Sequence, residues 1–288
     1  MSPNLAIFTC PICRAALLPL DKQWSCANKH SFDRARQGYT NLLPVQNKKS
    51  KSPGDDINMV AARSRFLATD KYQAISDRLN ELLIKILSES IEEPARIIDA
   101  GCGEGYYTSR LQQALNSDAI KTDITGIDIS KYAAIAAARR DKEIRWFVAS
   151  SSDMPLQDNS ADIILSLFSP LPAKEFHRCL KHRGFLIVAA TGADHLIELR
   201  RLIYDDVRED SFNPATVLEP YFERDNKAIV EPKNVRFEMV LDDTQMIIDL
   251  FSMTPHFWRV SPERKAILDT LERLSITIDV QLQVFSVS

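Results

Sequence analysis

The sequence predicts a large α/β domain with a mostly parallel sheet covered on both faces, preceded by a small metal-binding module. Three observations predict this fold. Strand and helix patterns alternate from residue 96 onward, which is typical of a parallel sheet. The first of these strands runs into the glycine-rich turn GCGEG at residues 101–105. Three of the five cysteines lie with a histidine within residues 10–30. A chain of 288 residues is long enough for both parts.

The composition excludes several other classes of protein. Hydrophobic residues make up 45% of the chain and charged residues 26%, which are ordinary globular values. No run of about 18 apolar residues occurs, so we expect no membrane-spanning helix. The segment MSPNLAIFTC lacks the basic start and apolar centre of a secretory signal, which favours a cytoplasmic protein. In that reducing setting, clustered cysteines more often bind metal than form disulfides.

The N-terminal cluster has the spacing C-x2-C followed by C-x3-H, which is typical of zinc ligands on two tight turns. Four protein ligands leave no open position for water, which indicates a structural rather than a catalytic zinc. Trp24 and Phe32 can cover the metal, since so small a module has little core of its own. The alternative is a redox pair or free thiols, but no βαβ pattern lies nearby. The predicted ligands are Cys10, Cys13, Cys26 and His30.

Charge is distributed unevenly along the chain. Residues 1–65 carry ten basic and four acidic residues, a net charge of +6, whereas the remainder carries −9. A basic front on an acidic body favours contact with a polyanion, although a solvated surface or a flexible linker gives the same pattern. We therefore divide the chain into a zinc-binding recognition module (1–36), a basic linker with a first helix from about Ile57 (37–70), and the main domain (71–288). The candidate polyanion contacts are Arg34, Arg36, Lys48, Lys49, Lys51, Arg63 and Arg65.

The stretch RIIDAGCGEGYYTSRL predicts a buried strand at residues 96–100, a glycine turn and a helix from about Tyr106. The spacing is neither the dinucleotide fingerprint G-x-G-x-x-G nor a P-loop, because no Gly-Lys-Ser/Thr follows. The stretch resembles motif I of the Rossmann-like S-adenosylmethionine methyltransferases, an acid followed by Gly-x-Gly-x-Gly. The resemblance implies that Asp99 orients the loop or meets the methionine ammonium. The matching glycines are Gly101, Gly103 and Gly105.

Two later strand ends support this resemblance. Asp128 ends the next strand, where a carboxylate can accept both ribose hydroxyls of the cofactor. The alternative role for Asp128 is a helix cap, but Ser130 is the better cap candidate. After the third strand, Ala149, Ser150 and Asp153 lie where this class holds adenine. Two further strands follow, then two late ones within residues 235–243 and 276–288. The resemblance to this methyltransferase class implies that one of the late strands is antiparallel.

The whole chain resembles one family, the bacterial large-subunit (23S) ribosomal RNA guanine-N1 methyltransferases of the RlmA type. The segments that carry the resemblance are CPIC…C…KHSFDRARQGYTNLLPVQNKKSKSPGD, AARSRFL…YQAI, DAGCGEGYYT, GIDISK, FVASSSDMPL, HLIELRRLIYDDV and MTPHFWR. It implies a class I methyltransferase domain with a seven-stranded sheet, S-adenosylmethionine and zinc as cofactors, ribosomal RNA as partner and a homodimer. It implies cofactor contacts at Tyr72, Gly103, Tyr107, Thr108, Asp128 and His195.

The sequence departs from the class after the fourth strand, where it has SLFSPLP, and before the fifth, where KHRGF replaces the frequent Lys-Pro-Gly-Gly turn. Phe168 in the first of these segments either stacks on the target base or belongs to the core. We identify no catalytic base from the sequence. Asp153, His195 and solvent are the candidates to accept the proton of guanine N1.

The sequence leaves two other functions open. One is a small-molecule methyltransferase with a structural zinc, which needs no basic front. The other is a non-catalytic zinc RNA-binding protein on a degenerate body, against which the intact glycine turn and Asp128 argue. The sequence does not specify which guanine is modified.

Overall fold

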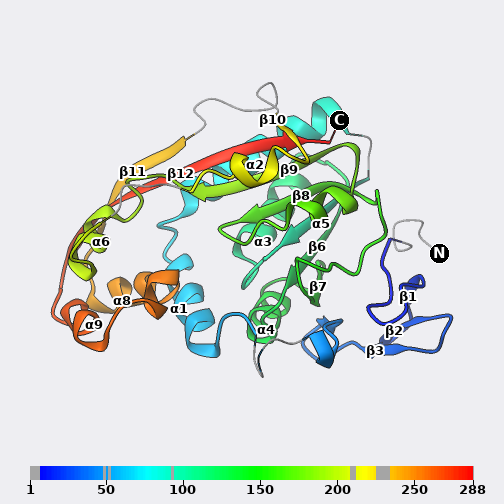
Figure 1. The fold of residues 1–288 in the computed structure, drawn as a ribbon, viewed down its shortest axis with the longest axis horizontal. Coiled ribbons are helices and arrows are strands. Elements are labelled where there is room, and N and C mark those ends of the chain that lie inside the picture. The colour runs from blue at the N-terminus through cyan, green and yellow to red at the C-terminus, as the bar shows by residue number, and fades with distance from the viewer. Residues whose placement is uncertain are drawn as a thin grey trace.

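The computed structural model describes residues 7–47, 50, 53–91, 94–207, 212–224 and 234–287. It has a small antiparallel sheet near the N-terminus and a nine-stranded sheet that organises the rest of the chain (Figure 1). Within these residues, no helix combines the length and the apolar character needed to cross a membrane.

The small sheet consists of β1 (Leu17–Pro19), β2 (Gln23–Cys26) and β3 (Ser31–Asp33), paired in chain order. Trp24 on β2 lies opposite Phe32 on β3 and is 3% exposed. Its ring also packs edge-on against Phe8 and Phe147, with centroids 5.2 and 5.3 Å away. Phe147 belongs to the large sheet, so the observed contacts of Trp24, which we expected to cover the metal, join the module to the main domain.

The large sheet has the order β10-β12-β9-β8-β5-β6-β7-β4, with β11 also paired to β12. The pairs from β4 to β9 are parallel, and β12 is antiparallel to β9, as the resemblance to the methyltransferase class implies. The strands are β4 (Thr40–Asn41), β5 (Ala95–Ala100), β6 (Thr122–Asp128), β7 (Arg145–Val148), β8 (Ala161–Leu167), β9 (Leu180–Thr191), β10 (Glu223–Arg224), β11 (Asn234–Leu241) and β12 (Leu274–Ser286).

Seven of these strands form the predicted sheet, and β4 and β10 are two-residue additions to it. β4 pairs with the edge strand β7, and Leu42 then donates its N–H to the Val148 carbonyl at 2.9 Å. This addition satisfies backbone groups that an open edge would leave unpaired. Strands of two residues carry no periodic signal, which is why the sequence did not predict them.

The helices pack around the large sheet. The helix from Ile57 and the start of α3 at Tyr106 both lie where the sequence predicts them. The helices are α1 (Ile57–Leu67), α2 (Gln73–Ser90), α3 (Tyr106–Ser117), α4 (Lys131–Arg140), α5 (Ala173–Cys179), α6 (Ile197–Ile203), α7 (Ala215–Leu218), α8 (Thr244–Ser252) and α9 (Pro262–Leu268), with 3-10 turns η2 (Val45–Asn47) and η3 (Pro255–Trp258).

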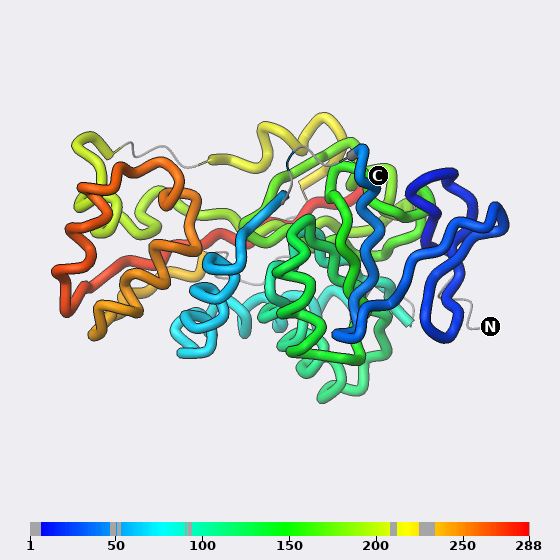
Figure 2. The backbone as a smooth tube through the Cα atoms, turned by 90° about the horizontal axis from the view of Figure 1, so that it is seen from below, coloured from blue at the N-terminus to red at the C-terminus, as the bar shows by residue number. Residues whose placement is uncertain are grey.

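Alternate residues of the central strands face two separate cores. Ile97 on β5 packs in the core that includes α2, α3 and α4. Its neighbour Ile98 packs in a second core with α5 and with Phe8, Leu17 and Trp24 of the N-terminal module. The module therefore covers part of one sheet face. At the opposite end of the molecule, α8, η3 and α9 gather beside α1 and α6 (Figures 1 and 2).

Candidate functional site

The glycine turn lies at the carboxyl ends of β5 and β6. Gly101, Gly103 and Gly105 have φ angles of 92°, 56° and 81°, a region that favours glycine. A Cβ on Gly101 or Gly105 would come within 2.8 Å of a neighbouring side chain, so these two permit close packing. A Cβ on Gly103 would meet nothing nearer than the Arg63 guanidinium at 3.6 Å. There is therefore room for a small group beside Gly103, and Arg63 borders that space.

Asp99 lies at the end of β5 beneath this turn and is 1% exposed. Its Oδ2 accepts a hydrogen bond of 2.6 Å from the Thr108 hydroxyl, so Thr108 holds the acid in place. Its Oδ1 has no hydrogen-bond partner among the described residues. Burial raises the pKa of Asp99 to about 7, partly offset by Thr108 and reinforced by Asp128. A positively charged partner would therefore stabilise the charged form of this carboxyl group.

Asp128 at the end of β6 closes the turn from the other side. Its Oδ2 accepts from the Gly103 N–H at 2.9 Å and its Oδ1 from the Ser130 N–H at 2.7 Å. Burial raises the pKa of Asp128, and these two backbone donors oppose the shift. Ser130 is the N-cap of α4, as expected, and accepts from the Ala133 N–H. A carboxylate has about four acceptor positions, so Asp128 retains capacity for two hydroxyls.

Aromatic side chains border the turn. Tyr72, at the start of α2, is buried and lies 6.5 Å from the His195 ring, so the family resemblance named two residues that the fold brings together. Tyr107 lies 6.2 Å from Phe168, and its buried hydroxyl has no described hydrogen-bond partner. Phe168 is 42% exposed and has a φ of 54°. Of the two roles expected for Phe168, the core role is therefore excluded. A non-glycine residue with strained backbone often marks a functional position.

His195 follows β9 and is held by the last strand. Its Nδ1 lies 3.3 Å from the Asp279 N–H and accepts from it, so the neutral ring carries its proton on Nε2. Burial, reinforced by the nearby His256, lowers the pKa of His195 to about 4. At neutral pH the ring offers a donor, which suits contact with an acceptor on the cofactor or the base better than removal of a proton.

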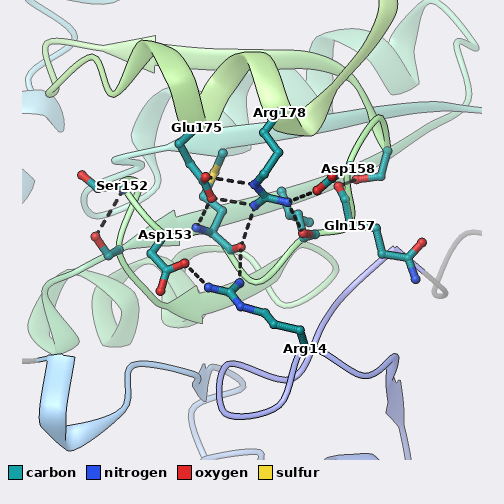
Figure 3. Close-up of polar contacts among 11 residues, drawn as sticks. Arg14, Ser152, Asp153, Gln157, Asp158, Glu175 and Arg178 are labelled. Carbon is teal, nitrogen blue, oxygen red and sulfur yellow. Dashed lines mark hydrogen bonds and ion pairs between the residues drawn. The ribbon is translucent and has the colours of Figure 1, made fainter.

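Asp153 lies in the turn after β7 and points toward the N-terminal module (Figure 3). It forms an ion pair with Arg14, whose guanidinium also donates to the Met154 carbonyl at 3.3 Å. Ser150 starts the same turn, and its hydroxyl accepts from the Ser152 N–H at 3.2 Å. The ion pair occupies Asp153, which disfavours it as a general base. It also joins the module to the segment expected to hold adenine.

The four predicted metal ligands converge in the module. Their ligand atoms all lie within 4.8 Å of one another. The Cys10 and Cys26 sulfurs each lie 3.5 Å from His30 Nδ1, and the Cys13 and Cys26 sulfurs are 3.7 Å apart. Ligands on a tetrahedral zinc at about 2.3 Å are separated by roughly 3.8 Å. The set therefore fits zinc closely, with no position left for water.

The candidate polyanion contacts fall into separate regions. Arg34 and Arg36 are exposed beside β3, whereas Lys48, Lys49 and Lys51 lie outside the described residues. Arg63 pairs with Asp55 and donates to the Met253 carbonyl at 3.2 Å, next to the glycine turn. Arg65 forms two hydrogen bonds, of 2.8 and 2.6 Å, with Asp249 on α8.

Three contacts were not anticipated from the sequence. They are the Arg14–Asp153 ion pair, the Arg63–Asp55 pair beside Gly103, and a hydrogen bond of 2.9 Å between the Tyr204 hydroxyl and His256 Nδ1. Each joins residues at least eight positions apart, and two of them join segments more than 50 residues apart. All of these residues except Arg14 lie in segments that carry the family resemblance, but nothing in those segments indicates which residue pairs with which.

The fold and the two sites define a class: a Rossmann-like, S-adenosylmethionine-dependent methyltransferase with an N-terminal zinc ribbon. Two family models match the chain. One is a methyltransferase domain, over residues 97–184. The other is the zinc ribbon described as RlmA, N-terminal, over residues 8–51. The predicted class I fold and the two predicted cofactors are confirmed.

Full-length relatives specify the family. The chain is 33% identical to the "Putative 23S rRNA (guanine-N(1)-)-methyltransferase YxjB" of Bacillus subtilis (strain 168), over 97% of this chain and 96% of the relative. It is 31% identical to the 23S rRNA (guanine(748)-N(1))-methyltransferase of Streptomyces fradiae, over 89% of this chain and 88% of the relative. The chain belongs to the family of 23S rRNA guanine-N1 methyltransferases, as the resemblance predicts.

The residues around the turn fit S-adenosylmethionine. Asp99 Oδ1 and the Tyr107 hydroxyl are buried and lack partners among the described residues, although buried polar atoms normally have them. Gly103 has room beside it for a small group, and Asp128 at the adjacent strand end retains acceptor capacity. Such positions at the carboxyl ends of parallel strands are where this kind of sheet binds its ligands.

Proposed function

We propose that this chain transfers a methyl group from S-adenosylmethionine to N1 of a guanine in a hairpin loop of 23S ribosomal RNA. The observation that carries the proposal is the joint presence, in one chain, of a zinc ribbon set and a glycine turn with unsatisfied buried acceptors. The names of the two full-length relatives support this substrate.

In this proposal Asp99 meets the cofactor ammonium, and Asp128 accepts from the ribose hydroxyls. The turn at Ser150 receives adenine, while Tyr72, Tyr107 and His195 line the methionine end. S-adenosylmethionine supplies a methyl group on a positively charged sulfur. The remaining cofactor positions are Gly101, Gly103, Gly105 and Thr108. The zinc ligands are Cys10, Cys13, Cys26 and His30.

The guanine must leave its base pair before it reacts, because N1 carries a proton and faces the Watson–Crick partner. In this scheme Phe168, which is exposed beside Tyr107, stacks on the extruded base. As the bond from N1 to the methyl carbon forms, the carbon–sulfur bond breaks and its electron pair stays on sulfur. The N1 proton leaves to solvent in this scheme, because Asp153 is ion-paired and His195 offers a donor. Alignment of the three reacting atoms provides most of the rate enhancement.

RNA binding in this proposal uses the basic front: Arg34, Arg36, Lys48, Lys49, Lys51, Arg63 and Arg65. Contacts to phosphates make binding dependent on salt, and single-stranded loop bases provide specificity. We further propose that the enzyme works in the cytoplasm as a homodimer.

The decisive experiment is transfer of tritiated methyl groups to 23S ribosomal RNA that lacks the modification. We expect RNA-dependent incorporation that maps to one guanine, where N1 methylation arrests reverse transcription. Incorporation into small molecules without RNA would favour a small-molecule methyltransferase with a structural zinc. RNA binding without incorporation, in protein that binds S-adenosylmethionine poorly, would favour a non-catalytic RNA-binding protein.

A further inference from the structure

The segment at residues 253–259, which links α8 to α9, carries an exposed tryptophan. The chain has three tryptophans, and all of them are described. Trp24 and Trp146 are 3% and 2% exposed, whereas Trp258 is 64% exposed. A single exposed aromatic residue is common on protein surfaces, so its surroundings must decide whether it binds anything.

This segment lies next to the methyl-donor turn. Arg63, which lies 3.6 Å from the Cβ position of Gly103, donates to the Met253 carbonyl at 3.2 Å. Three residues further on, His256 is bonded to Tyr204 at 2.9 Å. The start of this segment is therefore joined through Arg63 to the turn that we propose to hold the methyl donor.

The Trp258 ring packs at the edge of a small aromatic cluster. Its ring packs edge-on against Phe257, with centroids 5.2 Å apart. Phe257 in turn packs on Phe251 of α8, and the Lys265 ammonium lies 3.9 Å from the Phe257 ring centroid. A side chain fixed in this way loses little conformational entropy when it stacks on a ligand.

The charge around Trp258 suits a nucleic acid. Arg259 follows it directly, is exposed, and forms no ion pair with any residue that the structure describes. Lys265 adds a second cation beside the same aromatic cluster. An aromatic ring with an unpaired cation next to it is the combination that binds an unpaired nucleotide, by base stacking and phosphate contact.

We propose that Trp258 stacks on an unpaired base of the RNA substrate and that Arg259 contacts an adjacent phosphate. This surface would be a second RNA contact, at the end of the molecule opposite the zinc module (Figures 1 and 2). The proposal rests on the proposed function and adds an RNA-binding residue to it.

The exposed tryptophan provides its own probe. We would titrate the full-length zinc-loaded protein with the 23S hairpin RNA and follow tryptophan fluorescence and its quenching by acrylamide, with Trp258→Phe as the background. We expect the RNA to quench and shield Trp258, and Trp258→Ala to weaken RNA binding by ~10-fold, since one base–aromatic stack contributes about 1–3 kcal/mol. Affinity for S-adenosylmethionine should stay unchanged. Tyr221→Ala, an aromatic residue 41% exposed elsewhere, is the matched control.

Equal RNA affinity in Trp258→Ala and the wild type would overturn the proposal. Shielding of Trp258 that grows with protein concentration in the absence of RNA, and is lost together with the dimer in Trp258→Ala, would assign the surface to self-association instead. If the wild type methylates the RNA while Trp258 stays accessible in the complex, only this inference fails. If the wild type binds the cofactor but methylates no ribosomal RNA, the proposed function itself fails.

Discussion

The zinc module and the methyl-donor site are built in different ways. The four metal ligands lie within 21 residues, and their residue types and spacing are nearly sufficient to identify the site. The proposed methyl-donor site gathers residues from Tyr72 to Asp279, and much of it consists of backbone conformation and strand ends. The first kind of site is local in sequence, whereas the second exists only once the sheet has formed.

This difference predicts separable losses. Damage to the metal set should abolish module folding and RNA recognition first, and damage to the turn should abolish cofactor binding first. The Arg14–Asp153 ion pair joins the two regions. Damage to one region can therefore affect the function of the other through this contact. The following predictions test whether RNA recognition and cofactor binding can be lost separately, from the largest expected effect to the smallest.

Loss of zinc should have the largest effect, because binding of a structural zinc supplies ~10–16 kcal/mol to such small modules. Cys26→Ser, or treatment with a strong chelator, should remove bound zinc and lower RNA affinity severely. Metal analysis and filter binding with the hairpin RNA measure both losses. Cys179→Ala, which changes a cysteine outside the cluster, should retain zinc. Full RNA affinity without zinc would contradict the role of the module.

Asp128→Ala should weaken S-adenosylmethionine binding by ~10- to ~100-fold, because the Gly103 and Ser130 N–H groups lose a charged acceptor as the ribose contact is lost. Calorimetric titration measures the change. Zinc content should stay at the wild-type level, which separates the two sites. Asp118→Ala, an exposed acid at the end of α3, is the control and should bind normally.

Cofactor affinity should rise with pH because of Asp99. Its folded pKa is raised to about 7, so the acid is protonated below that pH and gains charge above it. Binding through the cofactor ammonium should therefore strengthen from about pH 6 to pH 7.5. Asp99→Asn should bind more weakly and show a flatter profile. An identical profile in both proteins would refute the contact.

The raised pKa of Asp99 also predicts how the stability of the cofactor-free protein depends on pH. A carboxyl group whose folded pKa is raised contributes most stability below its unfolded pKa of about 3.9 and loses that contribution as pH rises toward 7. Asp99→Asn should therefore reduce the decline in stability between about pH 4 and pH 7. Denaturant unfolding at several pH values tests this prediction.

Arg14→Ala should have the smallest effect on cofactor binding. The ion pair with Asp153 is about half exposed, and exposed pairs contribute about 1 kcal/mol or less. We expect a decrease of up to ~5-fold in S-adenosylmethionine affinity, with zinc retained. The double exchange Arg14→Asp with Asp153→Arg should recover part of the loss. If neither change moves cofactor affinity, the two regions are independent.

The sequence predicted the metal set fully, because zinc ligands depend on residue type and spacing. It predicted the glycine turn and Asp128, because a strand followed by Gly-x-Gly-x-Gly imposes a local geometry. It did not predict that Asp153 is turned toward Arg14 or that His195 is oriented by the Asp279 N–H, because these contacts join distant segments. It also did not predict the exposed, left-handed Phe168, whose backbone angle depends on the loop around it.

Strand β12 sets the spacing between the two ends of the molecule. It has 13 residues and, at about 3.3 Å per residue, spans roughly 40 Å. It starts beside the helices that carry Trp258, and Phe285 near its end shares a core with Phe8 and Trp24 of the module. The length of β12 therefore fixes the distance between the segment that carries Trp258 and the zinc module. In the proposed RNA complex, a fragment too short to span this distance can engage only one end, so progressive trimming should reduce affinity in a step rather than gradually.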